Sequence, residues 1–250
     1  AAYEILGGLA VSCFACFVTV ELLFQTAIGA ETGAAPSNVP PKRVLILDSF
    51  GRDAPPFNAG IVALRTALAK ELGEPVDIYD QSLEMARLVE PDAESTIADF
   101  LERRFAQHGP DVVLPVGAPA IAFVAKYRDR IFTNTPMVFM GADQRRLRPE
   151  FFTPNTTLVA ANVNLPAAIE NILQVLPATT NVMVVFGASR LETFWVEECR
   201  REFLTFAKRV GFEWMTHARL EDIENRAASL PPNSAIFFPM LVLDSAGVPY

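Results

Sequence analysis

Three strand-to-helix turns hold the residues best suited to binding a ligand. Gly117-Ala118-Pro119, Gly141-Ala142-Asp143 and Gly187-Ala188-Ser189 each follow a short apolar run of the chain. Glycine lets the backbone turn sharply or approach a ligand closely, and the N-terminus of a following helix offers free N–H groups to a carboxylate or another acceptor. Each turn by itself is also ordinary turn chemistry. Because three alike turns recur, the pattern favours a cleft whose walls they form.

Nucleophilic catalysis would need a serine with a base beside it. Ser49 and Ser189 both follow predicted strands, but neither His108 nor His217 has the place that a catalytic triad requires. A hydrolase that uses Ser49 or Ser189 stays an alternative without a placed base. We therefore predict no catalytic residue in this chain.

The sequence lacks the common cofactor and metal motifs. No turn carries G-x-G-x-x-G, and no stretch matches the phosphate-binding pattern G-x-x-x-x-G-K-[ST]. Cys13 and Cys16 match C-x-x-C without the second pair or the strand–helix context that a metal or redox site needs. The two histidines are far apart and have no ligand-like spacing. We therefore expect no cofactor and no metal ion.

The composition fits a folded domain with an acidic surface. The 250 residues carry a formal net charge of −8 and are 51% hydrophobic, which is enough for a sizeable core. Binding to the phosphates of nucleic acid needs a basic patch, and the sequence has no long run of Lys or Arg. We therefore expect no nucleic-acid partner.

Apolar runs that alternate with helical patterns position the three turns. Near-continuous apolar runs are typical of strands buried on both faces of a parallel sheet. Between the runs, apolar residues recur at helical spacing, as in Ile61, Leu64 and Leu68. Four strands alternating with helices predict a doubly wound α/β lobe with right-handed crossovers. The expected strands are residues 43–50, 76–80, 111–117 and 136–141.

A second α/β lobe is predicted after the alternation of strands and helices is interrupted. Residues 157–164 are expected to be an extended connection between the lobes, and the alternation then restarts with a helix through Ile169 and Leu176. A longer helix is expected from Trp195 to Val210. The chain stops soon after the third strand of this lobe, so we expect the lobe to be incomplete. Its expected strands are residues 181–187, 212–218 and 235–242.

The first 30 residues differ from the rest of the chain. Residues 5–24 are apolar throughout except for Glu21. About 20 apolar residues span a bilayer, whereas a secretory signal has a shorter apolar region followed by small residues, for which Ile28-Gly29-Ala30 could serve. Both readings stay open. The expected division is 1–30 signal or transmembrane anchor, 31–42 Pro/Ala/Gly/Ser linker, 43–156 N-terminal lobe, 157–164 connection and 165–250 C-terminal lobe.

Several motifs, taken in order, resemble one known family. The stretches VLILDSF, PDVVLPVGAPA, TPMVFMGAD and NVMVVFGAS, with Phe194-Trp195 in the next helix, are similar to those of the ABC-transporter-type substrate-binding domain. That family has a type I periplasmic-binding-protein fold. The variant with Gly-Ala-Ser before a helical Trp looks most like the extracytoplasmic sensor region of bacterial membrane histidine kinases. The likeness covers residues 43–250.

The resemblance implies a ligand that lies between two lobes joined by a hinge near Ala161-Asn162. It also implies that the three turns line the cleft. Trp195 could line it too, although its helical stripe with Cys199 and Phe203 fits core packing equally well. The predicted ligand-binding residues are Ser49, Phe50, Gly117, Ala118, Pro119, Gly141, Ala142, Asp143, Asn162, Gly187, Ser189, Trp195 and Met240.

The resemblance and the strand ends together give a functional expectation. Small residues, backbone donors and apolar groups such as Phe50 and Met240 favour an organic acid or an aromatic solute over a sugar. We expect an extracytoplasmic sensor domain, the input module of a membrane histidine kinase, which would be a homodimer. The N-terminal helix would anchor it in the bacterial inner membrane, with the main domain in the periplasm. The alternative is an ABC transporter substrate-binding protein that delivers the solute to a permease.

Overall fold

The computed structural model describes residues 40–51, 54–55, 57–85 and 92–250, which belong to one compact unit. The predicted signal or anchor, residues 1–30, lies outside the described residues, together with Cys13, Cys16 and most of the predicted linker. Among the helices of the described part, none is long and apolar enough to cross a membrane.

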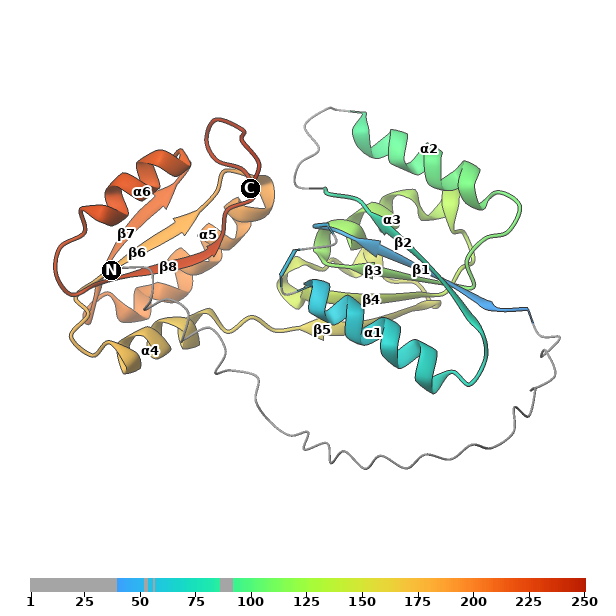
Figure 1. The fold of residues 1–250 in the computed structure, drawn as a ribbon, viewed down its shortest axis with the longest axis horizontal. Helices are drawn as coiled ribbons and strands as arrows, with labels where there is room; N and C mark the ends of the chain where they lie inside the picture. Colours follow the sequence, from blue (N-terminus) through green and yellow to red (C-terminus); the bar gives the residue numbers. More distant parts are fainter. Residues whose placement is uncertain (1–39, 52–53, 56, 86–91) are drawn as a thin grey trace, which may run out of the picture. The chain divides into compact units, whose positions relative to one another are not determined.

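The N-terminal lobe is built on a five-stranded parallel sheet (Figure 1). Its strands are β1 (Lys42–Asp48), β2 (Val76–Ser82), β3 (Val112–Val116), β4 (Met137–Asp143) and β5 (Thr156–Ala161). Their order is β2-β1-β3-β4-β5, and each neighbouring pair runs parallel. β1 therefore lies inside the sheet, with β2 added on one side of it and β3, β4 and β5 on the other. This places a topological switch point between β1 and β3.

Strand β5 departs from the expected organisation. The sequence predicts residues 157–164 to be a connection between the lobes, whereas β5 uses the first part of this segment as an edge strand that pairs with β4. Exposed residues interrupt the burial along β5, as expected for an edge strand with one face partly open to solvent. Such a strand lacks the continuous apolar run that reveals the buried strands, which is why the pattern does not identify it.

Helices cover both faces of the first sheet. They are α1 (Phe57–Glu71), α2 (Ala93–Phe105) and α3 (Ala118–Ile131), and two short 3-10 turns, η1 (Gln144–Arg146) and η2 (Pro149–Phe151), follow β4. On one face α1 packs against Val44 and Ile46 of β1. On the opposite face α2 and α3 pack against Leu45 and Leu47 (Figure 1). Successive strand residues point to opposite faces, so residues 44–47 of β1, which are buried on both faces, are all apolar.

The C-terminal lobe contains a three-stranded parallel sheet. Its elements are α4 (Leu165–Val175), β6 (Asn181–Phe186), α5 (Arg190–Phe203), η3 (Leu204–Phe206), β7 (Gly211–Thr216), α6 (Leu220–Ala228) and β8 (Ser234–Met240). The strand order is β7-β6-β8, with both pairs parallel. The helix predicted to run to Val210 ends earlier, at Phe203, and η3 continues it in a tighter turn.

The two faces of the second sheet are covered in the same way. Helices α4 and α5 pack with Val182 and Val184 on one face. Helix α6 packs with Met183 and Val185 on the other face. The fold class is thus α/β with parallel sheets flanked by helices, which confirms the prediction from the sequence.

Candidate ligand-binding site

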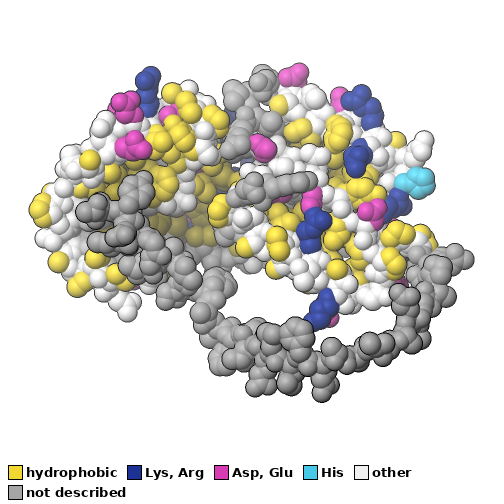
Figure 2. All heavy atoms as spheres, in the orientation of Figure 1, with side chains coloured by type: hydrophobic (Ala, Val, Ile, Leu, Met, Phe, Trp, Pro, Cys, Tyr) yellow, Lys and Arg dark blue, Asp and Glu magenta, His cyan; other side chains and the backbone are white. Residues whose placement is uncertain are grey.

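A cavity of about 1190 Å³ lies at the carboxyl ends of strands from both sheets. Open α/β sheets bind their ligands outside these ends, at a topological switch point. Figure 2 shows hydrophobic side chains gathered in a recessed part of the visible face. Of the predicted ligand-binding residues, those on the cavity wall are Ser49, Phe50, Ala118, Pro119, Gly141, Ala142, Asp143, Trp195 and Met240. The remaining four, Gly117, Asn162, Gly187 and Ser189, are not part of the wall.

The Ser49 side chain joins the end of β1 to the end of β3 and the start of α3. Its hydroxyl donates to the carbonyl oxygen of Val116 at 2.6 Å and accepts the N–H of Ala120 at 2.9 Å. Because the hydroxyl proton is committed to a backbone carbonyl, Ser49 shares no proton with a base in this arrangement. Its role in the site is to position the turn that carries Ala118 and Pro119.

Position 117 must be a glycine because of its backbone conformation and its close neighbours. Its φ is +87°, in the region that favours glycine. A Cβ at this position would lie 2.8 Å from Cε2 of Phe50 and 2.8 Å from Oγ of Ser49, closer than such atoms can approach. The glycine thus lets Phe50 and Ser49 pack at the switch point, and the predicted close approach of a ligand is not needed to explain it.

Aromatic and small residues form the part of the wall that β1, α1 and β4 contribute. The rings of Phe50 and Phe57 stack with their centroids 4.5 Å apart. A Cβ on Gly141 would lie 3.5 Å from Cε1 of Phe57, so the last part of β4 packs on the same ring. The carboxylate of Asp48 shapes the turn before Phe50 by accepting the N–H groups of Phe50 at 3.2 Å and Gly51 at 2.7 Å. Burial nevertheless raises the pKa of Asp48 above its usual value.

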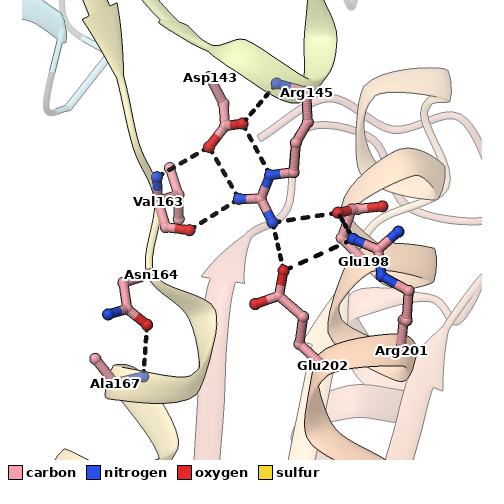
Figure 3. Close-up of polar contacts among 8 residues, drawn as sticks. All are labelled: Asp143, Arg145, Val163, Asn164, Ala167, Glu198, Arg201 and Glu202. Atoms are coloured by element: carbon pink, nitrogen blue, oxygen red, sulfur yellow. Dashed lines mark hydrogen bonds and ion pairs between the residues drawn. The ribbon is translucent and has the colours of Figure 1, made fainter.

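Asp143 and Arg145 hold the segment that leaves the first sheet (Figure 3). Arg145 donates from Nε to Oδ1 of Asp143 at 2.8 Å and from Nη2 to Oδ2 at 2.9 Å. Val163 donates its N–H to Oδ2 of Asp143 at 2.9 Å, and its carbonyl oxygen accepts from Arg145 Nη2 at 2.8 Å. The bond from Arg145 lowers the pKa of Asp143 to about 2, against a smaller effect of burial. Asn162, the predicted hinge residue, is exposed and directly precedes this anchored position.

Arg145 also reaches the second lobe. Its Nη1 donates to Oε1 of Glu202 at 2.5 Å and to Oε2 of Glu198 at 3.2 Å, and both carboxylates belong to α5 (Figure 3). The guanidinium carbon lies 5.3 Å from the ring centroid of Trp195, a residue of the cavity wall. Asp143, acting first among these partners, raises the pKa of Arg145 further above its usual value. One side chain thus links the end of β4, the inter-lobe segment and α5.

Gly187 and Ser189 serve the start of α5 instead of the cavity. The buried carboxylate of Glu192 accepts the N–H of Gly187 at 3.0 Å, that of Ser189 at 2.8 Å and that of Val242 at 2.7 Å. Ser189 in turn caps the helix by accepting the N–H of Glu192 at 3.4 Å. This is a capping box, and its sequence signal, Ser followed three residues later by Glu, stands in the chain. The Gly-Ala-Ser turn is explained by this motif.

The charged stretch after β4 holds two arginines, Arg145 and Arg146, whose surroundings the sequence pattern does not reveal. Its pattern predicts a solvated surface, but Arg145 is largely buried in the network above and Arg146 lies on the cavity wall. Their partners come from distant parts of the chain, so local charge patterning cannot identify them. Helix α5 does carry a faint signal, because Glu198 and Glu202 recur at helical spacing on one face.

Asp143 and Asp244, two buried carboxylates that follow strands, have separate roles. Asp143 binds Arg145, whereas Asp244 accepts the N–H groups of Ala246 at 2.8 Å and Val248 at 2.9 Å in its own loop. Within the described ranges no three His, Cys, Asp or Glu side chains gather as metal ligands would. Burial raises the pKa of the Cys199 thiol to about 12, so it stays protonated at neutral pH.

Comparison with known proteins shows similarity in the fold and in nothing further. Neither the models of known protein families nor the curated proteins gave a match to this chain. Among solved structures, a conserved domain protein from Vibrio cholerae is 17% identical with a TM-score of 0.50, and the match covers 74% of this chain and 60% of that one. The chain shares with this structure an α/β fold of parallel sheets flanked by helices.

Two further neighbours have ligands in their descriptions. The ABC domain in complex with L-Trp from Streptococcus pneumonia is 18% identical with a TM-score of 0.48, and the match covers 70% of this chain and 56% of that one. A leucine binding protein from Thermotoga maritima is 14% identical with a TM-score of 0.49, covering 80% of this chain and 57% of that one. This chain thus spans between 56% and 60% of the length of the three structures compared.

Proposed function

We propose that this domain binds a small organic solute, an organic acid or an aromatic compound, in the cavity at the strand ends. The observation that carries the proposal is that one cavity of about 1190 Å³ takes its wall from the carboxyl ends of β1, β3 and β4 and also from β6 and β8. In α/β folds ligands bind at such strand ends. A ligand in this cavity would contact both lobes at once.

The chemistry of the wall supports an apolar solute body. Ligand sites are mostly apolar with a few placed polar groups, and this wall includes Phe50, Phe57, Met140 and Trp195. Two of the polar wall residues are already engaged, because Ser49 bridges backbone groups and Asp143 binds Arg145. A sugar would need many more free polar side chains than such a wall offers.

The size of the cavity supports a closing motion. Ligand sites usually measure roughly 300–1,000 Å³, so this cavity exceeds what a small solute fills. A solute that touches both lobes more fully in a closed state would shift the population toward that state. The segment between β5 and α4, which includes Asn162, is the proposed hinge, because among the described residues it is the segment through which the chain passes from one sheet to the other.

A substitution at Gly60 tests whether the cavity binds the solute. Gly60 lies on the wall within α1, is exposed, and has no described atom within 4 Å of a Cβ added there. Gly60→Phe should therefore fill part of the cavity without unfolding α1, and it should abolish solute binding. Gly60→Ala is the matched control, because both changes favour the helix by about 0.5–1 kcal/mol and only Phe adds bulk.

The measurement is a thermal-shift screen in which the protein is mixed with organic acids, aromatic compounds or sugars. A solute at 100 times its Kd should stabilise the wild-type domain by about 2.7 kcal/mol. Gly60→Ala should keep this shift and Gly60→Phe should lose it. Full stabilisation of Gly60→Phe would place the binding site elsewhere, and stabilisation by sugars alone would contradict the proposed solute class.

The proposed role of the domain is sensing, as the input module of a membrane histidine kinase anchored by the N-terminal segment. This role rests on the sequence resemblance, and delivery of the solute to an ABC permease is the alternative. Deletion of the gene separates the two roles. Loss of a transcriptional response with unchanged uptake of the labelled solute supports sensing, whereas loss of uptake supports transport.

A further inference from the structure

Arg146 is a cation on the cavity wall for which the described residues provide no partner of opposite charge. It ends η1, directly after the carboxyl end of β4, and it lies on the wall of the cavity. Throughout the described part of the chain, Arg146 makes no ion pair or hydrogen bond, and its Nε is buried without an acceptor. Its guanidinium carbon lies 4.5 Å from the ring centroid of Phe194. Arg145, the preceding residue, is in contrast saturated with carboxylates.

This arrangement has an energetic cost that calls for an explanation. An arginine stays charged in proteins, and Arg146 is half-buried with its Nε fully buried, so it loses hydration that no counter-charge replaces. Burial lowers the pKa of Arg146, and the charge of Arg148 lowers it further. A water molecule can accept a hydrogen bond from Nε, but it supplies no negative charge. A buried polar group left unpaired in a cavity is therefore best explained by an anion that binds there.

The two described acidic residues of the cavity wall, Asp143 and Glu84, do not fill this role. The carboxylate of Asp143 is bound in a bidentate manner by Arg145. Glu84, also on the wall, is engaged in an interaction of its own and acts electrostatically on Asp48. The Arg146 guanidinium lies over the ring of Phe194, and a cation in this position is attracted by the face of the ring.

We propose that Arg146 binds the carboxylate of the solute, and that the ligand is a monocarboxylate with an aromatic or branched aliphatic body. This inference rests on the proposed function of the cavity. A guanidinium and a carboxylate match in a planar, two-bond geometry. A single unpaired arginine balances one negative charge, which favours a monocarboxylate over a phosphate. The apolar body would lie against wall residues such as Met140 and Trp195.

The test compares acids with their neutral amides. The probes are phenylacetate and phenylacetamide, indole-3-acetate and indole-3-acetamide, and 4-methylpentanoate and its amide, measured by thermal shift and calorimetry. We expect at least one carboxylate to bind and its amide to bind far more weakly. Arg146→Gln should weaken carboxylate binding by about 10- to 100-fold. Arg148→Gln is the matched control, because it removes the same charge from an exposed neighbour and should leave affinity unchanged.

A second measurement separates a binding arginine from a merely structural one. Arg146→Met keeps the bulk and removes the unpaired charge, so the melting temperature of the empty domain should stay the same or rise. If Arg146 instead stabilises the fold through its contact with Phe194, Arg146→Met should lower the melting temperature of the empty domain.

Three results would overturn the inference. They are equal binding of acids and amides, unchanged carboxylate affinity in Arg146→Gln, and no binding of any carboxylate by the wild-type domain. Binding of neutral solutes that Gly60→Phe abolishes would then leave the proposed function standing without Arg146.

Discussion

At the scale of single residues, Asp143 is the anchor of the site. The residue is only 5% exposed, and its carboxylate accepts four hydrogen bonds, three from Arg145 and one from Val163. These bonds favour the charged form enough to hold the pKa at about 2, below the ordinary 3.8. Asp143 therefore stabilises the folded state whenever it is ionised, and it fixes the chain where it leaves β5 for α4.

Replacing Asp143 should reveal this contribution through its pH dependence. Because the folded-state pKa is depressed, the stabilisation is complete above the unfolded pKa near 4 and is lost as the pH falls through about 2. Asp143→Asn should lower the free energy of unfolding by about 2 kcal/mol at pH 7, and the gap should shrink between pH 4 and pH 2.

Urea denaturation of both proteins across this pH range measures the effect. Asp129→Asn, a change at an exposed position of α3, is the control and should show no such gap. A difference between Asp143→Asn and wild type that stays constant down to pH 2.5 would contradict the assignment.

At the scale of elements, the start of α5 joins three pieces of the second lobe. Glu192 is 0% exposed, and its carboxylate accepts N–H groups from the end of β6, from the cap of α5 and from Val242 after β8. A Cβ on Gly187 would lie 2.3 Å from Oε1 of Glu192, so the glycine makes room for this carboxylate. The turn is thus a structural joint that holds the second half of the cavity wall in place.

Removing the Glu192 carboxylate should therefore weaken the whole lobe. Glu192→Ala leaves three buried N–H groups without an acceptor, and we expect a loss of about 3 kcal/mol in the free energy of unfolding. Glu197→Ala, at an exposed position of the same helix, should cost less than about 0.5 kcal/mol. Chemical denaturation compares the two variants. A Glu192→Ala domain as stable as Glu197→Ala would show that water replaces the carboxylate.

The elements also show how far the sequence predicts this fold. Continuous apolar runs identified β1, β3, β4 and β6, because strands buried on both faces leave that pattern. The edge strand β5 was missed as part of the sheet, since it is buried only in part. The strand-end rule led to the cavity, but it could not separate Gly117 and Gly187, which serve packing, from Gly141, which lies on the wall. Arg145 and Arg146 depend on partners remote in sequence, which no local pattern encodes.

At the scale of the whole molecule, polar contacts cross from one lobe to the other beside an apolar cavity. Arg145 extends from the end of β4 to Glu198 and Glu202 of α5, next to the segment that joins the lobes. Contacts of this kind hold a preferred arrangement without the area of a permanent interface, and domain motion is the default where interfaces are polar. We infer that this network biases the lobe arrangement, while the solute would bias it from the cavity side.

A double-mutant cycle tests whether the lobes are coupled through this network. The side chains of Arg145 and Glu202 are 26% and 22% exposed, so screening by solvent is partial. Arg145→Met, Glu202→Gln and the double variant should give a coupling energy of about 1 kcal/mol in urea denaturation. The control cycle uses Arg209 and Glu170, an ion pair within the second lobe whose side chains are 52% and 54% exposed, and it should give at most about 0.5 kcal/mol. A coupling energy for Arg145 and Glu202 no larger than the control would mean that the two lobes are not held by this contact. Closure around a solute would then depend on the inter-lobe segment and the ligand alone.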